Sequence, residues 1–226
     1  MRNFKKTLSF LLSTVIIVSS VVGVGTTVFA ATDEHTYKNF KYRILDDNTA
    51  EICGYTGKNA VVTVPDSIDS KPVTSIGRTA FYSGKIKEVT IPNTVRSIKW
   101  WAFYGCESLE KINLNFGLKT VGYGAFMNCK KLKSVSIPMS VTQICDDSFA
   151  VSCSTQKGVF DTYSKQTIST QQYSTDSSFT LEGYSGTVAE KYCNDNSLNF
   201  VSSGNVIYGD VDNNGTVEAA DAKLAK

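Results

Sequence analysis

The sequence contains a single histidine, His35, and lacks the commonest catalytic motifs. There is no C-x-x-C pair for zinc or thioredoxin-like chemistry, no G-x-S-x-G and no phosphate-binding glycine loop. With His35 as the only histidine, catalysis that needs several histidines and His-rich metal sites are excluded. His35 precedes the repeats in a stretch expected to be loose, and nothing in the sequence pairs it with a nucleophile. Charged residues make up 19% of the 226 residues without a basic block, which excludes an electrostatic nucleic-acid site.

The first thirty residues predict a secretory signal peptide. Three cations, Arg2, Lys5 and Lys6, precede an apolar run over 8–28 that leads into a small-residue cleavage site. An uncleaved membrane anchor is the alternative, but Ser, Thr and Gly interrupt the run, so we expect cleavage after Ala30. The mature chain, with 20 positive and 21 negative residues, is then expected to be secreted, with no stable membrane span.

A repeat of 22 to 23 residues organises the chain that follows. Four phenylalanines recur at spacings of 22, 23 and 23: Phe81, Phe103, Phe126 and Phe149. Apolar triplets with L-x-x-L-x-L spacing follow the first three: Ile86, Val89, Ile91; Leu109, Ile112, Leu114; and Leu132, Val135, Ile137. A unit this short cannot bury its own apolar face, so neighbouring units must stack. The pattern predicts a repeat solenoid of the leucine-rich-repeat type, with short parallel strands joined by turns or short helices.

The repeats resemble the BspA-type leucine-rich repeats, whose units read I-P-x-x-V-T-x-I-G-x-x-A-F-x-x-C-x-x-L-x-x-V-x-I-P. Ile91-Pro92 and Ile137-Pro138 carry the join between units. The resemblance covers about residues 38–203, including first and last segments similar to capping units. A Ser-, Thr- and Gln-rich segment at 154–178 breaks the period, and we expect either a surface loop or a decayed repeat there.

Six cysteines in an exported chain would suggest three disulfides. However, Cys106 and Cys129 occupy equivalent repeat positions, which the resembling family fills with cysteine as a small buried hydrophobe. We therefore expect these two to be unpaired. The remaining cysteines could form two bridges, which spacing alone does not decide: Cys145 with Cys153, and Cys53 with Cys193.

A solenoid presents repeated surface positions, so residues between the apolar strand positions are candidates for recognising a protein or glycan. These candidates are Lys87, Glu88, Glu110, Lys111, Asn113 and Lys133. Exposed aromatic residues often anchor ligands, and Trp100, Trp101 and Tyr123 fall outside the core columns. The alternatives are simple solvation of the polar set and packing of the aromatic set against a neighbouring turn. The adjacent carboxylates Asp146 and Asp147 do not suit a glycosidase, so we predict no enzyme activity.

The C-terminal residues contain an EF-hand-like loop in which oxygen-bearing side chains fall at positions 1, 3, 5 and 12, with Gly215 at position 6. The predicted Ca²⁺ ligands are Asp210, Asp212, Asn214, Thr216, Glu218 and Asp221. Position 12 is aspartate rather than glutamate, and the segment resembles the first repeat of a type I-like dockerin. That resemblance implies Ca²⁺ as cofactor and a cohesin module of a cellulosome scaffold as partner. Only one loop is present in residues 206–226, so we expect either a fragment or a degenerate dockerin.

The sequence as a whole predicts a secreted, non-catalytic leucine-rich-repeat module. In the first interpretation the dockerin attaches the module to a cellulosome, and through it to the cell surface. This attachment links the protein to polysaccharide catabolism by association. In the second the protein is a bacterial surface adhesin or host-interaction protein with a non-functional dockerin remnant. A third interpretation places an enzyme in a missing C-terminal extension.

We predict weak Ca²⁺ binding and little or no cohesin binding by the 226-residue chain. Only 222–226 follow the loop, and such a short helix is marginal in water, so binding must also order the site. Calorimetry on the chain and on Asp210→Ala tests this, and adding a second dockerin repeat should rescue both activities. Tight Ca²⁺ binding that survives Asp210→Ala would place the site elsewhere, and tight cohesin binding would show that half a dockerin suffices.

Overall fold

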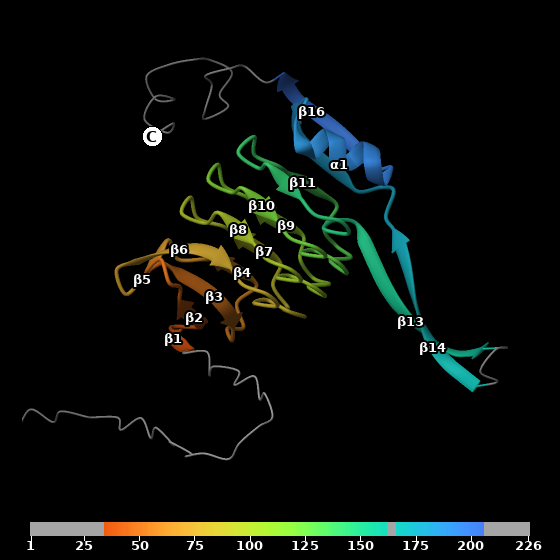
Figure 1. The fold of residues 1–226 in the computed structure, drawn as a ribbon, viewed down its shortest axis with the longest axis horizontal. Coiled ribbons are helices and arrows are strands. Elements are labelled where there is room, and N and C mark those ends of the chain that lie inside the picture. The colour runs from red at the N-terminus through yellow and green to blue at the C-terminus, as the bar shows by residue number, and fades with distance from the viewer. Residues whose placement is uncertain (1–33, 162–165, 206–226) are drawn as a thin grey trace, which may run out of the picture. The chain divides into compact units, whose positions relative to one another are not determined.

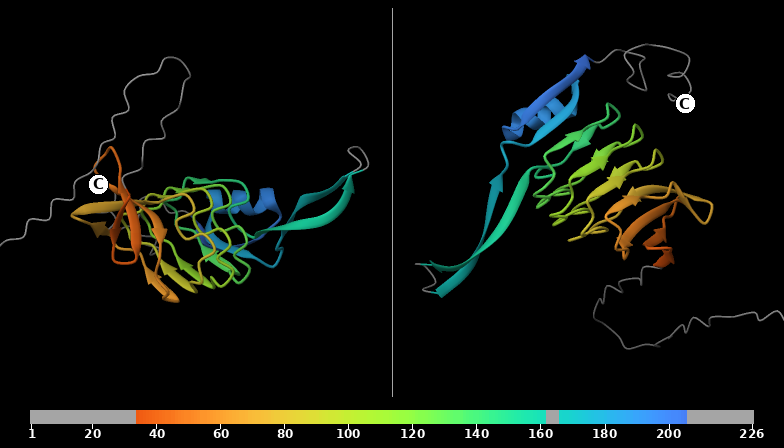
Figure 2. Two further views of the ribbon diagram at one scale, coloured as in Figure 1. Left: turned by 90° about the horizontal axis from the view of Figure 1, so that it is seen from below. Right: turned by 180° about the vertical axis from the view of Figure 1, so that it is seen from behind.

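The structure of this chain is a computed structural model that describes residues 34–161 and 166–205, with side chains described over 34–152 and 173–204. The predicted signal peptide and the predicted Ca²⁺ loop both lie outside the described residues. The described residues contain a solenoid whose successive turns stack along one direction (Figures 1 and 2).

One wall of the solenoid is a ladder of strands in the order β1-β2-β3-β6-β8-β10-β12, with β5 paired to β6. From β3 onward, the strands that follow one another in this order are parallel. The strands are β1 (His35–Tyr37), β2 (Phe40–Ile44), β3 (Ala50–Tyr55), β5 (Ser67–Ile68), β6 (Lys71–Ile76), β8 (Ser97–Ile98), β10 (Thr120–Val121) and β12 (Gln143–Ile144). The apolar triplets predict one strand in each repeat but not this additional ladder, because two-residue strands are too short to show an alternating pattern.

The second wall contains the strands that the apolar triplets predict. Its strands are β4 (Val61–Thr63), β7 (Glu88–Thr90), β9 (Lys111–Asn113), β11 (Ser134–Ser136), β15 (Thr180–Ser185) and β16 (Asn199–Asn205). They form two parallel sheets, β4-β7-β9 and β11-β15-β16. The central triplet residues Val89, Ile112 and Val135 are buried, and their strand neighbours face outward, as predicted.

The third side is a wall of tight turns that carries the Ala-Phe pairs. Alternate backbone amides of this turn wall donate hydrogen bonds within their own turn and to the next repeat. Ala80 N donates to Gly77 O at 3.3 Å, whereas Phe81 N donates to Ala102 O at 2.7 Å. The turn wall therefore satisfies its backbone groups across repeats without regular strands. The residue two positions before each of the four phenylalanines has a left-handed backbone conformation. Its φ is 56°, 56°, 58° and 54° at Thr79, Trp101, Gly124 and Asp147.

The predicted phenylalanine column forms the centre of the core. The rings of Phe81, Phe103, Phe126 and Phe149 are stacked, with centroids 4.8, 5.1 and 4.9 Å apart, and all four side chains are buried. Phe179 extends the stack beyond Phe149 at 5.9 Å. This spacing matches the roughly 4.8 Å between paired strands, so the ring column follows the backbone ladders.

Both ends of the stack are covered. At the first end, β1, β2 and β3 form an antiparallel meander, and Tyr55 contacts Phe81 with ring centroids 5.5 Å apart. His35, expected in a loose stretch, instead lies in β1 with its ring 5.3 Å from that of Tyr42. At the other end, helix α1 (Val188–Asn196) places Tyr192 edge-on against Phe149.

The Ser-, Thr- and Gln-rich segment is neither an irregular loop nor a decayed repeat. It forms a long antiparallel hairpin of β13 (Val151–Asp161) and β14 (Gln166–Thr175). The hairpin is inserted into one turn of the solenoid, and β15 resumes the repeat by pairing with β11. Ser, Thr and Gln gave no alternation of apolar and polar residues, so periodicity could not reveal these strands.

We predict that Phe103→Ala lowers the free energy of unfolding by about 3–5 kcal/mol, because it leaves a cavity between two stacked rings. Urea unfolding followed by circular dichroism measures the loss. Phe116→Ala is the control, since the Phe116 side chain is 47% exposed, and it should change stability by less than about 1 kcal/mol. A loss below about 1 kcal/mol for Phe103→Ala would remove this ring from the core.

Candidate functional site

The predicted aromatic residues gather with two charged residues on the surface of adjacent repeats. The Arg78 guanidinium lies 4.8 Å from the Trp101 ring, and Trp101 meets Tyr123 edge-on with centroids 6.2 Å apart. The Tyr123 hydroxyl bonds to Asp147, and this hydrogen bond, with some burial, raises the pKa of Tyr123. We call Arg78, Trp101, Tyr123 and Asp147 the aromatic cluster. It crosses four consecutive repeats.

Two glycines of the following repeat make room for the two tryptophans. A Cβ at Gly122 would lie 2.9 Å from Trp100 Cδ1, and a Cβ at Gly124 would lie 2.7 Å from Trp101 Cδ1. Trp101 is half-buried by this packing, which agrees with the packing alternative for that residue. The Trp100 side chain is 58% exposed and flanks the cluster, so its ring is accessible to a ligand.

The cluster brings two aromatic rings, a guanidinium and a carboxylate together within a small area. Trp, Tyr and Arg are the residues that most often dominate binding energy at protein interfaces. Their rings lose little conformational freedom on binding because the packing described above already holds them.

Most of the predicted polar residues on the second wall pair with one another or with a neighbouring charged residue. Lys111 Nζ lies 3.1 Å from Glu88 Oε1, and Asn113 Nδ2 donates to Glu88 Oε1 at 3.0 Å. Lys133 pairs with Asp176 at 2.7 Å, and Lys131 with Glu110 at 3.5 Å, while Lys87 is exposed. These pairs leave little unbalanced charge, so this wall carries less recognition chemistry than the aromatic cluster.

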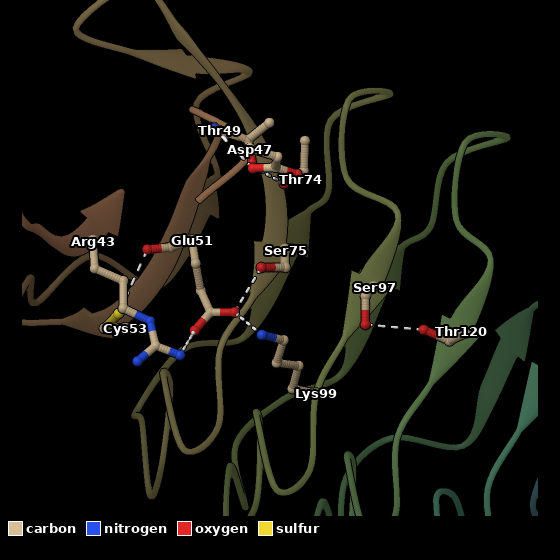
Figure 3. Close-up of polar contacts among 10 residues, drawn as sticks. All are labelled: Arg43, Asp47, Thr49, Glu51, Cys53, Thr74, Ser75, Ser97, Lys99 and Thr120. Carbon is tan, nitrogen blue, oxygen red and sulfur yellow. Dashed lines mark hydrogen bonds and ion pairs between the residues drawn. The ribbon is translucent and has the colours of Figure 1, made fainter. Parts of the chain in front are cut away.

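Glu51 lies at the centre of a second polar group, which the sequence analysis did not identify (Figure 3). The Arg43 Nη2 atom donates to Glu51 Oε1 at 2.6 Å, and Ser75 Oγ donates to Oε2 at 2.7 Å. Lys99 forms an ion pair with the same Oε2. Because β2, β3, β6 and the turn after β8 contribute these residues, the group ties the first cap to two repeats. Its carboxylate is fully engaged within the protein.

The surroundings of Glu51 keep it ionised and Cys53 protonated. Burial alone would raise the pKa of Glu51, but hydrogen bonds from Lys99 and Ser75 and the charges of Lys99 and Arg43 outweigh it and lower the pKa. Burial and the Glu51 charge raise the pKa of the neighbouring Cys53 thiol to about 11. Since the thiolate is the reactive form, Cys53 is a poor nucleophile.

Cys106 and Cys129 are buried free thiols, which confirms the prediction made from their repeat position. Cys106 Sγ donates to Phe81 O at 3.0 Å, and Cys129 Sγ donates to Phe103 O at 3.3 Å. Burial raises the pKa of Cys106 to about 12 and that of Cys129 well above its ordinary value. Both therefore act as core residues rather than reactive groups.

Of the two possible disulfides, the structure excludes Cys53 with Cys193. Both thiols are free, because Cys53 lies in β3 of the first cap and Cys193 in α1 of the last. Cys145 is also unpaired, and the side chain of Cys153 lies outside the described residues. Spacing could not distinguish these outcomes because it carries no information on distance in space.

Over 34–161 and 166–205, no group of three or more His, Cys, Asp or Glu side chains is arranged to hold a metal ion. The six predicted Ca²⁺ ligands lie outside these ranges. In the same part of the chain, no helix combines the length and apolar character needed to cross a membrane.

Comparison with known families identifies the repeats. The model of the BspA type leucine-rich repeat region matches residues 63–181 in six copies, which is more than half of the chain. The chain belongs to the BspA-type leucine-rich repeat family. The comparisons indicate no catalytic family and give no support for the dockerin resemblance, which stays a prediction. No curated protein matches the chain.

Several solved structures are similar to part of this BspA-type chain. A leucine-rich repeat protein from Bacteroides capillosus is 31% identical over 50% of this chain and 88% of its own, with a TM-score of 0.48. The T. pallidum leucine rich repeat protein is 34% identical over 49% and 53%, with a TM-score of 0.47. A leucine rich cell surface protein from Faecalibacterium prausnitzii is 28% identical over 52% and 40%, with a TM-score of 0.45. The family assignment rests on the repeat match rather than on these scores.

Arg78 and Asp147 are partners of the aromatic residues that the sequence did not predict. Both lie in the same repeat columns as the tryptophans: Arg78 aligns with Trp100, and Asp147 aligns with Trp101. Comparing each column with its neighbour one repeat away would have placed them together. In the sequence, Asp147 stands out only as one of two adjacent carboxylates that do not suit a glycosidase.

We predict that Glu51→Gln lowers the free energy of unfolding by about 1–3 kcal/mol at pH 7, because it removes charged hydrogen bonds from Arg43 and Lys99. The pKa of Glu51 is lower in the folded protein than in the unfolded chain. The stability that the ionised carboxylate contributes is therefore fully present above the unfolded-state pKa, and it is lost as the pH falls through the folded-state pKa. Urea unfolding should show the difference from wild type shrinking below about pH 4.

Glu88→Gln is the matched control, since Glu88 pairs with Lys111 at the surface and should change stability much less than Glu51→Gln. An equal effect of Glu51→Gln at pH 7 and at low pH would contradict the assigned network.

Proposed function

We propose that this BspA-type protein is an exported, non-catalytic binding module that recognises a protein partner through the aromatic cluster and Trp100. The observation that carries the proposal is the exposed Trp100 ring, next in sequence to Trp101 of the aromatic cluster. The polar pairs of the second wall are not part of this proposed surface.

The cluster composition favours a protein ligand over a glycan. Its cation and carboxylate are already engaged, with Arg78 over Trp101 and Asp147 at the Tyr123 hydroxyl. The part of the cluster that is left to contact a partner is mainly the aromatic rings, which the packing holds in place. Such rings suit a partner protein that presents an apolar patch with a charged rim. A glycan would instead require several unengaged hydrogen-bonding groups around the ring.

Attachment of the module is a separate part of the proposal. The dockerin-like segment 206–226, with Ca²⁺ held by the predicted residues Asp210 to Asp221, would bind a cohesin module of a scaffold. In the adhesin alternative the same repeat surface acts at a bacterial cell surface while the remnant is silent. Both versions use one recognition surface, so the binding test below applies to either.

We predict that Trp100→Ala weakens binding by at least about tenfold while changing stability by less than about 1 kcal/mol, because Trp100 is exposed. The wild-type chain is first screened on arrays of extracellular proteins and of glycans, and the affinity of the best ligand is then measured for each variant. Tyr82→Ala is the matched control, since Tyr82 and Trp100 are both 58% exposed.

Retained binding by Tyr82→Ala together with loss in Trp100→Ala supports the proposed surface. Unfolding of Trp100→Ala would support the packing alternative instead. Equal binding by both variants would place recognition elsewhere, and selective capture by the glycan array would replace the protein partner with a glycan.

A further inference from the structure

The second wall is interrupted between β9 and β11. These strands lie in contact but belong to separate sheets, whereas β10 and β12 of the same two repeats are paired on the first wall. The two repeats are therefore joined by paired strands on the first wall but not on the second. A groove of about 290 Å³ lies at this interruption.

The groove is built by the ends of four strands and the turn after β9. Its accessible lining includes Asn113, Phe116, Ser136, Pro138, Tyr184 and Ser203. Gly183 lies at its base, where a Cβ would approach Ala189 Cβ to 3.2 Å. The groove shares no residue with the aromatic cluster.

The sequence departs from its own repeat at this place. The turns after Ile91 and Ile137 begin with proline, whereas Asn115 occupies the equivalent position in the repeat between them. The next position holds Phe116, 47% exposed, where the neighbouring repeats have Asn93 and Met139. An aromatic ring is thus exposed beside the interruption, in a column that does not otherwise carry one.

The lining residues include no charged side chain, although charged pairs surround the groove on the same wall. A phosphate or other anion would find no cation in the lining. The Ser136 and Ser203 hydroxyls and the Asn113 Oδ1 atom can hydrogen-bond a ligand, since Asn113 Nδ2 already donates to Glu88 and Thr90. A purely apolar ligand would bury these groups without partners, which is unfavourable.

We propose that this groove binds one ring of a neutral saccharide. A sugar ring has an apolar face that packs on an aromatic side chain and hydroxyls that hydrogen-bond at its edge. The Phe116 and Tyr184 rings supply the first kind of contact, and Asn113, Ser136 and Ser203 supply the second. The groove lies near the lower end of the usual size range for ligand sites, which suits one ring of a longer chain.

The test is calorimetry and ligand-observed NMR on the full chain with cellobiose, maltose and lactose, and with glucuronic acid as a charged probe. We expect at least one disaccharide to bind with a dissociation constant on the order of a millimolar, because so small a ligand buries few atoms. Phe116→Asn restores the residue of the preceding repeat and should weaken binding about tenfold. Ser136→Lys places a charge in the groove and should weaken it similarly.

Trp100→Ala is the matched control, because it alters the aromatic cluster and should leave saccharide binding unchanged. Loss of binding in Trp100→Ala but not in Phe116→Asn would place the sugar at the cluster and overturn the groove assignment. Failure of all three disaccharides to bind would also overturn it. Equal or tighter binding of glucuronic acid would contradict the inferred neutrality of the ligand.

Discussion

The common spacing of the strand ladders and the phenylalanine stack determines how the rest of this molecule is arranged. Paired strands lie about 4.8 Å apart, and the rings of Phe81, Phe103 and Phe126 stack at 4.8 and 5.1 Å. Neither distance can change alone, because both belong to the same stacked repeats. Each residue therefore contacts its equivalents one repeat before and after it, and its size must suit theirs.

This constraint makes the surface a set of contacts between neighbouring columns. Trp101 can lie where it does because Gly124 occupies the next repeat, and its ring then reaches Arg78 on one side and Tyr123 on the other. A side chain at position 124 would occupy the same space. The aromatic cluster forms here because one repeat has large residues and the next has small ones, which a uniform repeat would not produce.

The periodic part of the fold could be predicted from the sequence, because a recurring phenylalanine and apolar triplet fix which residues are buried. The second strand ladder could not, since strands such as Ser97–Ile98 are only two residues long. The Glu51 group could not be predicted from the sequence either, because its partners Arg43, Ser75 and Lys99 meet only after the cap has folded onto two repeats. For the aromatic cluster, residue type alone indicated Trp101 and Tyr123 as candidate binding residues. Their charged partners Arg78 and Asp147 could not be predicted in the same way, because these contacts form between different repeats.

The hairpin shows how such a solenoid gains new surface without losing its ladder. Asn128 N donates to Val151 O and Asp176 N donates to Ala150 O, each at 2.8 Å, so hydrogen bonds hold both strands at the base of the insertion. The entropy of closing a loop grows slowly with its length, so a long insertion at this turn is tolerated. The ladder then resumes with β15 on β11, while β11 stays unpaired with β9. The repeat pattern thus supplies stability, and its departures at Phe116, at the two tryptophans and at this turn supply the distinct surfaces.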